Sequence, residues 1–293
     1  MRVYEPSAEE LLFHYCSAQT LMAMLKSRTV RFSDINMLND LQEFRWGYQV
    51  FEAAATRLIR REGIADDVPE LPQEFFDAVD EVVHRTQLIA HPFVACFSRE
   101  PDSLEQWRAY GDDGRGYCVG FSAEMLSQLP VTMFEVIYDI EQQMNEVVQL
   151  LCKLHGVYLS AAETNDHSLF KMLCAELGLM FASYKHPAFR SEREVRCVHA
   201  VQLQELPKGG RRFHDPGGTR AGEQEGGQPV AFYVRDGHLT AHLDMPFLVK
   251  DVTPVKAVIT GPKNRTATGN LLLYLASEGL DDVQFQHSQI PYR

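Results

Sequence analysis

The sequence has no long apolar run and no excess of positive charge. No stretch approaches the roughly 20 apolar residues that a membrane-spanning helix needs, and the first residues, MRVYEPSAEELLFHY, contain no signal-peptide apolar core. The formal net charge of -12 argues against a broad surface for nucleic acid or anionic membrane, because clustered Lys and Arg hold such partners. We therefore expect a cytoplasmic protein that does not bind membranes.

The common motifs for metal, disulfide and phosphate binding are also missing. The six cysteines are scattered without a CxxC pair, and most lie in apolar runs, where a free thiol behaves as a small apolar group. No H-E-x-x-H occurs, and the glycine-rich residues 209–227 fit neither the P-loop nor the dinucleotide fingerprint. We expect reduced cysteines and no bound metal.

The apolar pattern predicts one α+β domain over residues 1–293, with a mixed or antiparallel sheet. Helical insertions are expected at about 43–91 and 141–185, and a mobile, charged loop at about 208–228. The strands expected from short apolar or alternating runs lie at residues 11–15, 29–33, 93–98, 116–121, 132–138, 192–201, 230–235, 238–243, 255–260 and 283–287.

Residues 93–121 are a candidate wall of the site. Two apolar strands enclose a polar connection that carries Trp107 and Tyr110, which either pack or form a platform for stacking a ring. Ser98 ends the first strand, where its hydroxyl can cap the next turn. No G-x-S-x-G surrounds Ser98, so we do not interpret it as a hydrolase nucleophile.

The most specific signal is the alternation Glu192, Glu194, Arg196. A strand would place these three side chains on one face, where burial is costly unless the charges are paired or used. The face either meets solvent or presents a carboxylate pair that binds hydroxyls and stabilises positive charge.

Two further polar positions have both a structural and a functional interpretation. His14 lies within an apolar strand, either as a satisfied core histidine or as a ligand contact. Asn39 and Asp40 lie in a turn-rich loop, where such side chains commonly bond to their own backbone.

The chain resembles the bacterial "domain of unknown function 2971" family, whose biochemistry is poorly defined. The resemblance runs from residue 12 to the last residue; one departure is Leu41, where the family often has proline. The matching pieces are HY and VRFS near the start, ND..E at 39–43, CFS....L..W..Y at 96–110, G.C.GF at 116–121, F..E.EVR at 189–196, GPK at 261–263 and the final S.IPYR.

A weaker resemblance is to ADP-ribosyltransferase-like enzymes, which bind NAD in a split-sheet fold. His14, Ser98 and Glu194 follow the order of the family's His or Arg, Ser or Tyr, and Glu, and Glu192 completes an E-x-E pair. The resemblance implies that Glu194 stabilises the oxocarbenium-like ribose formed from NAD and that Glu192 orients the acceptor.

The same resemblance assigns the remaining residues to NAD binding. His14 would hold the adenosine-side ribose, Trp107 or Tyr110 would stack on nicotinamide, and Ser98 would steady the pocket. Asn39, Asp40 and Arg196 complete the expected NAD-binding set.

We therefore predict an NAD-dependent ADP-ribosyltransferase-like enzyme that modifies a nucleic acid or protein, with a toxin or defence role by analogy alone. One alternative is a metal-dependent nuclease that uses Asp40, Glu192 and Glu194 as ligands. Against it, Arg196 stands where the usual nuclease pattern has lysine. The other alternative is a non-catalytic ligand-binding module.

Overall fold

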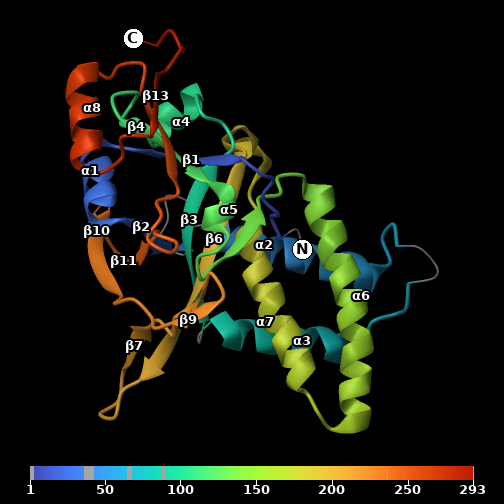
Figure 1. Ribbon diagram of the computed structural model, residues 1–293. Coiled ribbons are helices and arrows are strands. Elements are labelled where there is room, and N and C mark those ends of the chain that lie inside the picture. The colour runs from blue at the N-terminus through green and yellow to red at the C-terminus, as the bar shows by residue number, and fades with distance from the viewer. Residues whose placement is uncertain (1–2, 36–42, 65–67, 88–89, 236, 293) are drawn as a thin grey trace.

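The structure is a computed structural model that describes residues 3–35, 43–64, 68–87, 90–235 and 237–292. A large twisted sheet stands beside a layer of helices, and a few shorter helices cover the sheet's other side (Figure 1). The predicted α+β class with a mixed sheet is confirmed.

Three strands from distant parts of the chain form the centre of the sheet: β1 (Leu11–Cys16), β3 (Ala90–Ser98) and β6 (Glu194–Glu205). One edge of β3 pairs along its whole length with β6. The other edge pairs with β2 (Thr29–Asp34) through Val94 and with β1 only at Ser98. The sheet therefore forks at β3, with β1 leaving on one arm and β2 on the other.

Each arm continues through antiparallel neighbours, except that β13 runs parallel to β12. The first arm has the order β1–β4–β12–β13 and the second β2–β11–β10, while β5 and β7 pair with β6. The bounds are β4 Tyr117–Ser122, β5 Thr132–Glu135, β7 Arg211–His214, β10 Ala231–Arg235, β11 His238–Pro246, β12 Val255–Thr260 and β13 Gln284–His287.

One face of the sheet packs on short helices and is called the α1 face here. Helix α1 (Ala18–Ser27) begins after Ser17, whose hydroxyl accepts a hydrogen bond from the Thr20 amide. Leu21 and Leu25 of α1 share one apolar core with Phe97 and Val195 of the sheet. Helices α5 (Ala123–Leu126) and α8 (Thr268–Ser277) contribute to the same core.

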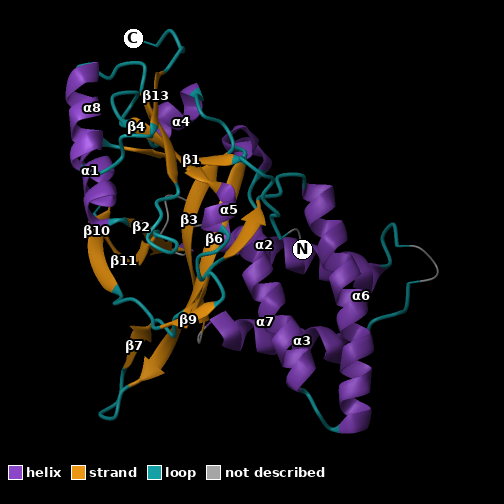
Figure 2. Ribbon diagram, in the orientation of Figure 1, coloured by secondary structure: helices purple, strands orange, loops and turns teal. Residues whose placement is uncertain are grey.

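The opposite face meets a layer of longer helices with its own core (Figure 2). This layer holds α2 (Glu43–Arg60), α3 (Gln73–Gln87), α6 (Ile140–Thr164) and α7 (Ser168–Met180). A 3-10 turn, Phe181–Ser183, joins α7 to the sheet: Ala182 is buried with Val94 and Val198. Helix α4 (Leu104–Ala109) covers the β1 arm on this same face.

Several expected boundaries differ from the structure. Residues 208–228, expected as a mobile loop, contain β7 and a separate hairpin of β8 (Gly218–Arg220) and β9 (Glu223–Glu225). The strand expected at 132–138 ends at Glu135. The strand expected from Glu192 begins at Glu194, because residues 187–192 form a 3-10 helix first.

Candidate functional site

A cluster of buried charges lies where β6 begins, on the face toward the helical layer. Glu192 ends the 3-10 helix Pro187–Glu192, and Arg193 then adopts a left-handed backbone conformation (φ 43°) before Glu194 starts the strand. This bend, rather than strand alternation, brings Glu192 and Glu194 to the same cation, Lys185. The expected common strand face of Glu192 and Glu194 is therefore wrong, although their proximity is real.

The cluster is a chain of ion pairs. The Nζ of Lys185 lies 2.5 Å from Oε2 of Glu192 and 3.0 Å from Oε2 of Glu194. Arg196 donates from Nε to Oε1 of Glu194 at 2.6 Å and from Nη2 to Oε2 at 3.2 Å. Arg196 is fully buried (0% exposed), so the interpretation as a solvent-facing strand edge is wrong.

Glu194 is held as a carboxylate. Burial by itself would raise the pKa of Glu194, but Arg196 and Lys185 outweigh that effect and hold the pKa well below its usual range. The hydroxyl of Tyr138 also accepts the Glu194 backbone N–H at 3.0 Å. With both oxygens bonded to cations, Glu194 has a fixed position and a fixed charge.

Glu192 differs from Glu194 in exposure and in proton affinity. Its side chain is 12% exposed, against 4% for Glu194, and its Oε1 accepts a hydrogen bond from the Tyr110 hydroxyl at 3.1 Å. Burial raises the pKa of Glu192, Lys185 opposes the rise, and the charge of Glu194 adds to it. Of the two carboxyls, Glu192 is therefore the one that exchanges a proton more readily.

Trp107 and Tyr110 separate into two roles. Trp107, in α4, is fully buried, donates from Nε1 to Asp102 at 2.6 Å and packs edge-on against Tyr15, so the packing interpretation holds for it. Tyr110 follows α4 and reaches Glu192. Burial and the nearby Glu192 charge raise the pKa of Tyr110, so it stays a hydrogen-bond donor.

Ser98 contacts the cluster through the backbone. Its hydroxyl donates to the Glu192 carbonyl at 2.7 Å and accepts from the Glu100 amide at 3.0 Å. Ser98 pairs with Glu194 on one side and with Phe13 on the other, so these three residues form one row across β6, β3 and β1. The hydroxyl thereby fixes the turn that carries Glu192.

His14 lies on the other face of the sheet. Side chains alternate along β1, so His14 points opposite to Phe13 and therefore opposite to the row containing Glu194. Its ring lies 5.7 Å from that of Phe97, on the α1 face, and its Nδ1 lies 3.0 Å from the Cys96 carbonyl oxygen. Burial lowers the pKa of His14, and the neutral ring donates to this carbonyl at the fork of the sheet. The structure does not bring His14 together with Glu192 and Glu194.

Two members of the cluster were not predicted from sequence, and two predicted residues lie elsewhere. Lys185 and Tyr138 come from segments next to α7 and β5. Lys185 is explained once the structure shows both carboxylates buried, since two buried carboxylates with one arginine require another cation. Asn39 and Asp40 lie outside the described residues.

The GPK turn at 261–263 and the C-terminal IPYR segment contact the loop that follows Tyr110. Lys263 pairs with Asp113 at 2.8 Å, and its Nζ lies 3.8 Å from the centre of the Tyr292 ring. The Tyr292 hydroxyl also donates to Asp113, at 2.6 Å. These contacts hold the loop after Tyr110 against the C-terminal segment.

We also searched the described residues for metal-binding groups, hollows and membrane-spanning helices. Within the described ranges, no three His, Cys, Asp or Glu side chains are arranged to hold a metal ion. The helical layer has hollows of about 500 and 140 Å³, neither lined by residues of the charged cluster. No helix in the described part of the chain has the length and apolarity to cross a membrane.

The comparisons with known proteins identify a family and no activity. A search of curated proteins and a search of solved structures each found no match. The comparisons give no support to similarity with ADP-ribosyltransferases. Residues 106–197, from α4 into β6, match the family described as "Protein of unknown function (DUF2971)", and this stretch includes Tyr110, Lys185, Glu192, Glu194 and Arg196. The chain therefore contains a DUF2971 family domain at residues 106–197.

Proposed function

We propose that this chain is an ADP-ribosyltransferase-like enzyme that cleaves NAD and transfers ADP-ribose to a nucleic acid or a protein. In this proposal Glu192, and not Glu194, is the carboxylate that contacts the ribose. The observation that supports it is the asymmetry of the cluster: Glu194 is bonded to two cations, whereas Glu192 is bonded to one cation, is 12% exposed and has a raised pKa.

The chemistry of NAD cleavage fits such a pair. Loss of nicotinamide leaves an oxocarbenium-like ribose, which a carboxylate bonded to the ribose hydroxyl stabilises. Glu192 would then accept the proton of the attacking group, because burial and the charge of Glu194 raise its pKa above that of an ordinary glutamate. Glu194 acts through Lys185, which both carboxylates share, and so positions Glu192.

The strand arrangement gives further support. The strands that carry Glu194, Ser98 and His14 are neighbours, in the order β6–β3–β1, and the sheet divides at β3. The resemblance implied a split sheet with these residues on an early, a middle and a late strand, and the proposal uses their adjacency in this sheet. Because His14 points to the other face, the proposal does not include it in ribose binding. Its role there is structural: its ring bonds to the Cys96 carbonyl where the sheet divides.

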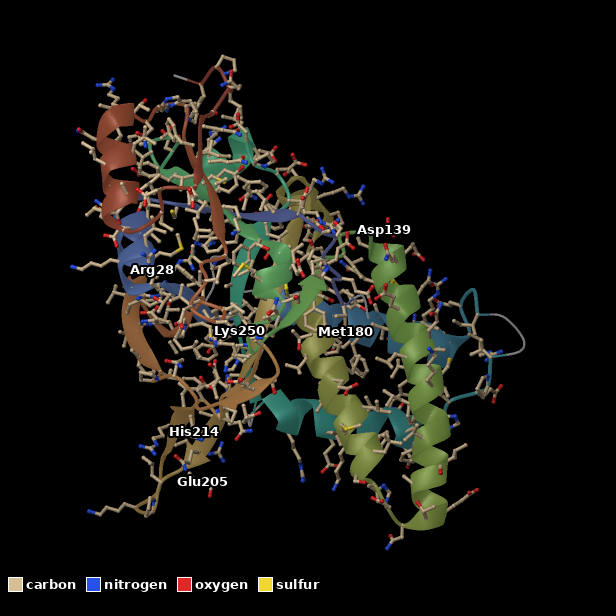
Figure 3. The ribbon with its side chains drawn as sticks, in the orientation of Figure 1. Arg28, Asp139, Met180, Glu205, His214 and Lys250 are labelled. Atoms are coloured by element: carbon tan, nitrogen blue, oxygen red, sulfur yellow. The ribbon has the colours of Figure 1, made fainter. Side chains whose placement is uncertain are left out.

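The test is NAD binding and nicotinamide release by the purified chain, compared with Glu192→Gln. We expect NAD to raise the melting temperature of both proteins. The substitution should slow nicotinamide release by at least about 100-fold, the low end of the rate contribution of a general acid or base. Glu205→Gln is the matched control, since Glu205 is exposed at the far end of β6 (Figure 3). It should release nicotinamide at the wild-type rate.

Other outcomes would overturn the proposal. If NAD neither binds nor is cleaved, the enzyme is not of this class. Nucleic-acid cleavage that requires added magnesium or manganese would favour the nuclease alternative, although Lys185 and Arg196 already neutralise the two carboxylates. NAD binding without release, in the presence of candidate acceptors, would favour the non-catalytic binding module.

A further inference from the structure

A second buried charge pair lies on the α1 face, away from the cluster at Glu192. His199 of β6 is 3% exposed, and both of its ring nitrogens face oxygen atoms. Nδ1 lies 2.7 Å from the Pro130 carbonyl oxygen, and Nε2 lies 2.7 Å from Oδ1 of Asp215. A carbonyl oxygen cannot donate, so Nδ1 must carry a proton.

The carboxylate of Asp215 fixes the second proton. Its Oδ1 also accepts the Gly217 amide at 2.7 Å, and its Oδ2 accepts the Gln228 amide at 2.6 Å. Burial would raise the pKa of Asp215, but the bond from His199 and the bonds from these two amides outweigh it and lower the pKa, so Asp215 is ionised and can only accept. Nε2 of His199 must therefore donate as well, and the buried ring is an imidazolium.

Asp215 closes the segment that carries the β8–β9 hairpin. The segment leaves the sheet at Asp215 and returns at Gln228, and one carboxylate binds amides near both ends. The closure is tight: a Cβ on Gly227 would lie 1.9 Å from the Asp215 carbonyl oxygen, so only glycine fits there. The Ala221 amide, in the turn of the hairpin, donates to the Gln128 carbonyl at 2.8 Å.

The charged groups around His199 favour its protonated form. Glu225 of β9 contributes negative charge and is paired with Arg220 of β8 at 2.7 Å. On β3, Phe93 is paired with His199 and His91 lies on the same face, two residues away. Burial would lower the pKa of His199, but the bonds to Asp215 and Pro130 outweigh it, and the pKa is raised.

We propose that the His199–Asp215 pair is a pH-sensitive fastening that holds the β8–β9 hairpin against the sheet. The hairpin is fastened while the ring is an imidazolium and loosens when the ring loses a proton, because one buried oxygen then faces a ring nitrogen without hydrogen. This proposal is independent of the proposed NAD chemistry.

The sign of the pH dependence follows from the raised pKa. The stabilisation is fully present below the ordinary histidine pKa of about 6.5 and is lost as pH rises through the higher folded value. Between those two values the opening equilibrium of the hairpin should rise about tenfold per pH unit, the slope for release of one proton.

Two measurements on the wild-type chain test the proposal directly. Nitrogen-15 NMR of labelled histidine should show both His199 ring nitrogens protonated at neutral pH. Hydrogen exchange of the β8–β9 amides, corrected for the intrinsic pH dependence, should show protection falling with the slope given above. A neutral His199 ring at pH 7, or protection that does not change between pH 6 and the folded pKa, would overturn the proposal.

Variants separate the fastening from general effects of pH. His199→Gln and Asp215→Asn should make hairpin protection low and independent of pH. The control is His214→Gln, which removes an exposed histidine next to Asp215 and should keep the wild-type profile. An unchanged profile in His199→Gln would contradict the proposal.

Discussion

At the scale of single residues, Lys185 holds two carboxylates together in a buried position. Its ammonium bonds to both Glu192 and Glu194, and Glu194 has Arg196 as a second partner. Removal of one member of such a pair leaves an uncompensated buried charge, which costs more than the pair contributes. Lys185 therefore has a large effect on folding even though it was not predicted.

Lys185→Met should lower the free energy of unfolding by about 3–5 kcal/mol. Urea denaturation followed by circular dichroism measures this loss. Lys208→Met, which changes an exposed lysine in the β6–β7 connection, should stay within about 0.5 kcal/mol of wild type. Equal effects of the two substitutions would contradict the assigned role of Lys185.

The depressed pKa of Glu194 predicts a loss of stability in acid. A carboxylate whose folded pKa lies below its unfolded value stabilises the fold above the unfolded value of about 4.5, and this contribution disappears as pH falls toward the folded pKa. The urea midpoint of wild type should therefore fall more steeply below pH 4.5 than that of Glu194→Gln. Parallel curves would show that Glu194 is not the responsible group.

The sequence predicted part of this site. Glu192, Glu194 and Arg196 were identified because charged residues alternate within a strand-like pattern. Their burial could not be predicted, since alternation does not say which face is covered. Lys185 was missed because the irregular turn between it and Glu192, which contains Pro187, has no fixed periodicity from which proximity can be inferred.

At the scale of elements, two helical glycines have opposite surroundings. Gly47 of α2 lies against the 3-10 turn after α7, and a Cβ there would come within 2.5 Å of the Phe181 Cβ. Gly156 of α6 has no atom within 4 Å of the corresponding position. The same substitution should therefore act in opposite directions at these two sites.

Gly47→Ala should destabilise the protein by about 1–3 kcal/mol, because α2 must move away from Phe181. Gly156→Ala should stabilise it by about 0.5–1 kcal/mol, the gain in helix propensity. Thermal unfolding of both variants checks the pair. A stable Gly47→Ala variant would mean that the contact between α2 and Phe181 is looser than the structure has it.

Element types were predicted better than element ends. Helix α1, for example, has apolar residues at helical spacing and a capping residue, Ser17, both of which are local signals. The hairpin of β8 and β9 was missed because its glycines and charges are typical of loops. The hairpin is held by Asp215, which binds the Gly217 amide and the ring of His199. His199 lies on another strand, and no local pattern in the sequence indicates this contact.

At the scale of the whole molecule, the matched family region is not a complete sheet. Residues 106–197 hold the charged cluster and α6, α7 and β4, but they lack β1 and β3. Strand β4 pairs with β1, and the first nine residues of β6, Glu194–Gln202, pair with the whole length of β3. The region therefore depends on partners from outside its own limits.

A fragment of residues 106–197 should not fold cooperatively. We expect it to show helical circular dichroism from α6 and α7 but poorly dispersed amide signals in NMR, unlike the complete chain. Addition of residues 3–105 as a separate chain is the control, because it restores β1 and β3. A well-dispersed spectrum from the fragment alone would contradict this dependence.

The fork at β3 also has a consequence for synthesis on the ribosome. The edge of β3 that pairs with β6 has no partner strand until β6 has been synthesised. That happens roughly a hundred residues later, or about 5–20 s at ordinary translation rates. During that interval the apolar run FVACFS exposes an unpaired strand edge, which is a template for aggregation. The nascent chain should therefore depend on chaperones until β6 emerges, and slower translation of the helical insertion between these strands should lower the yield of folded protein.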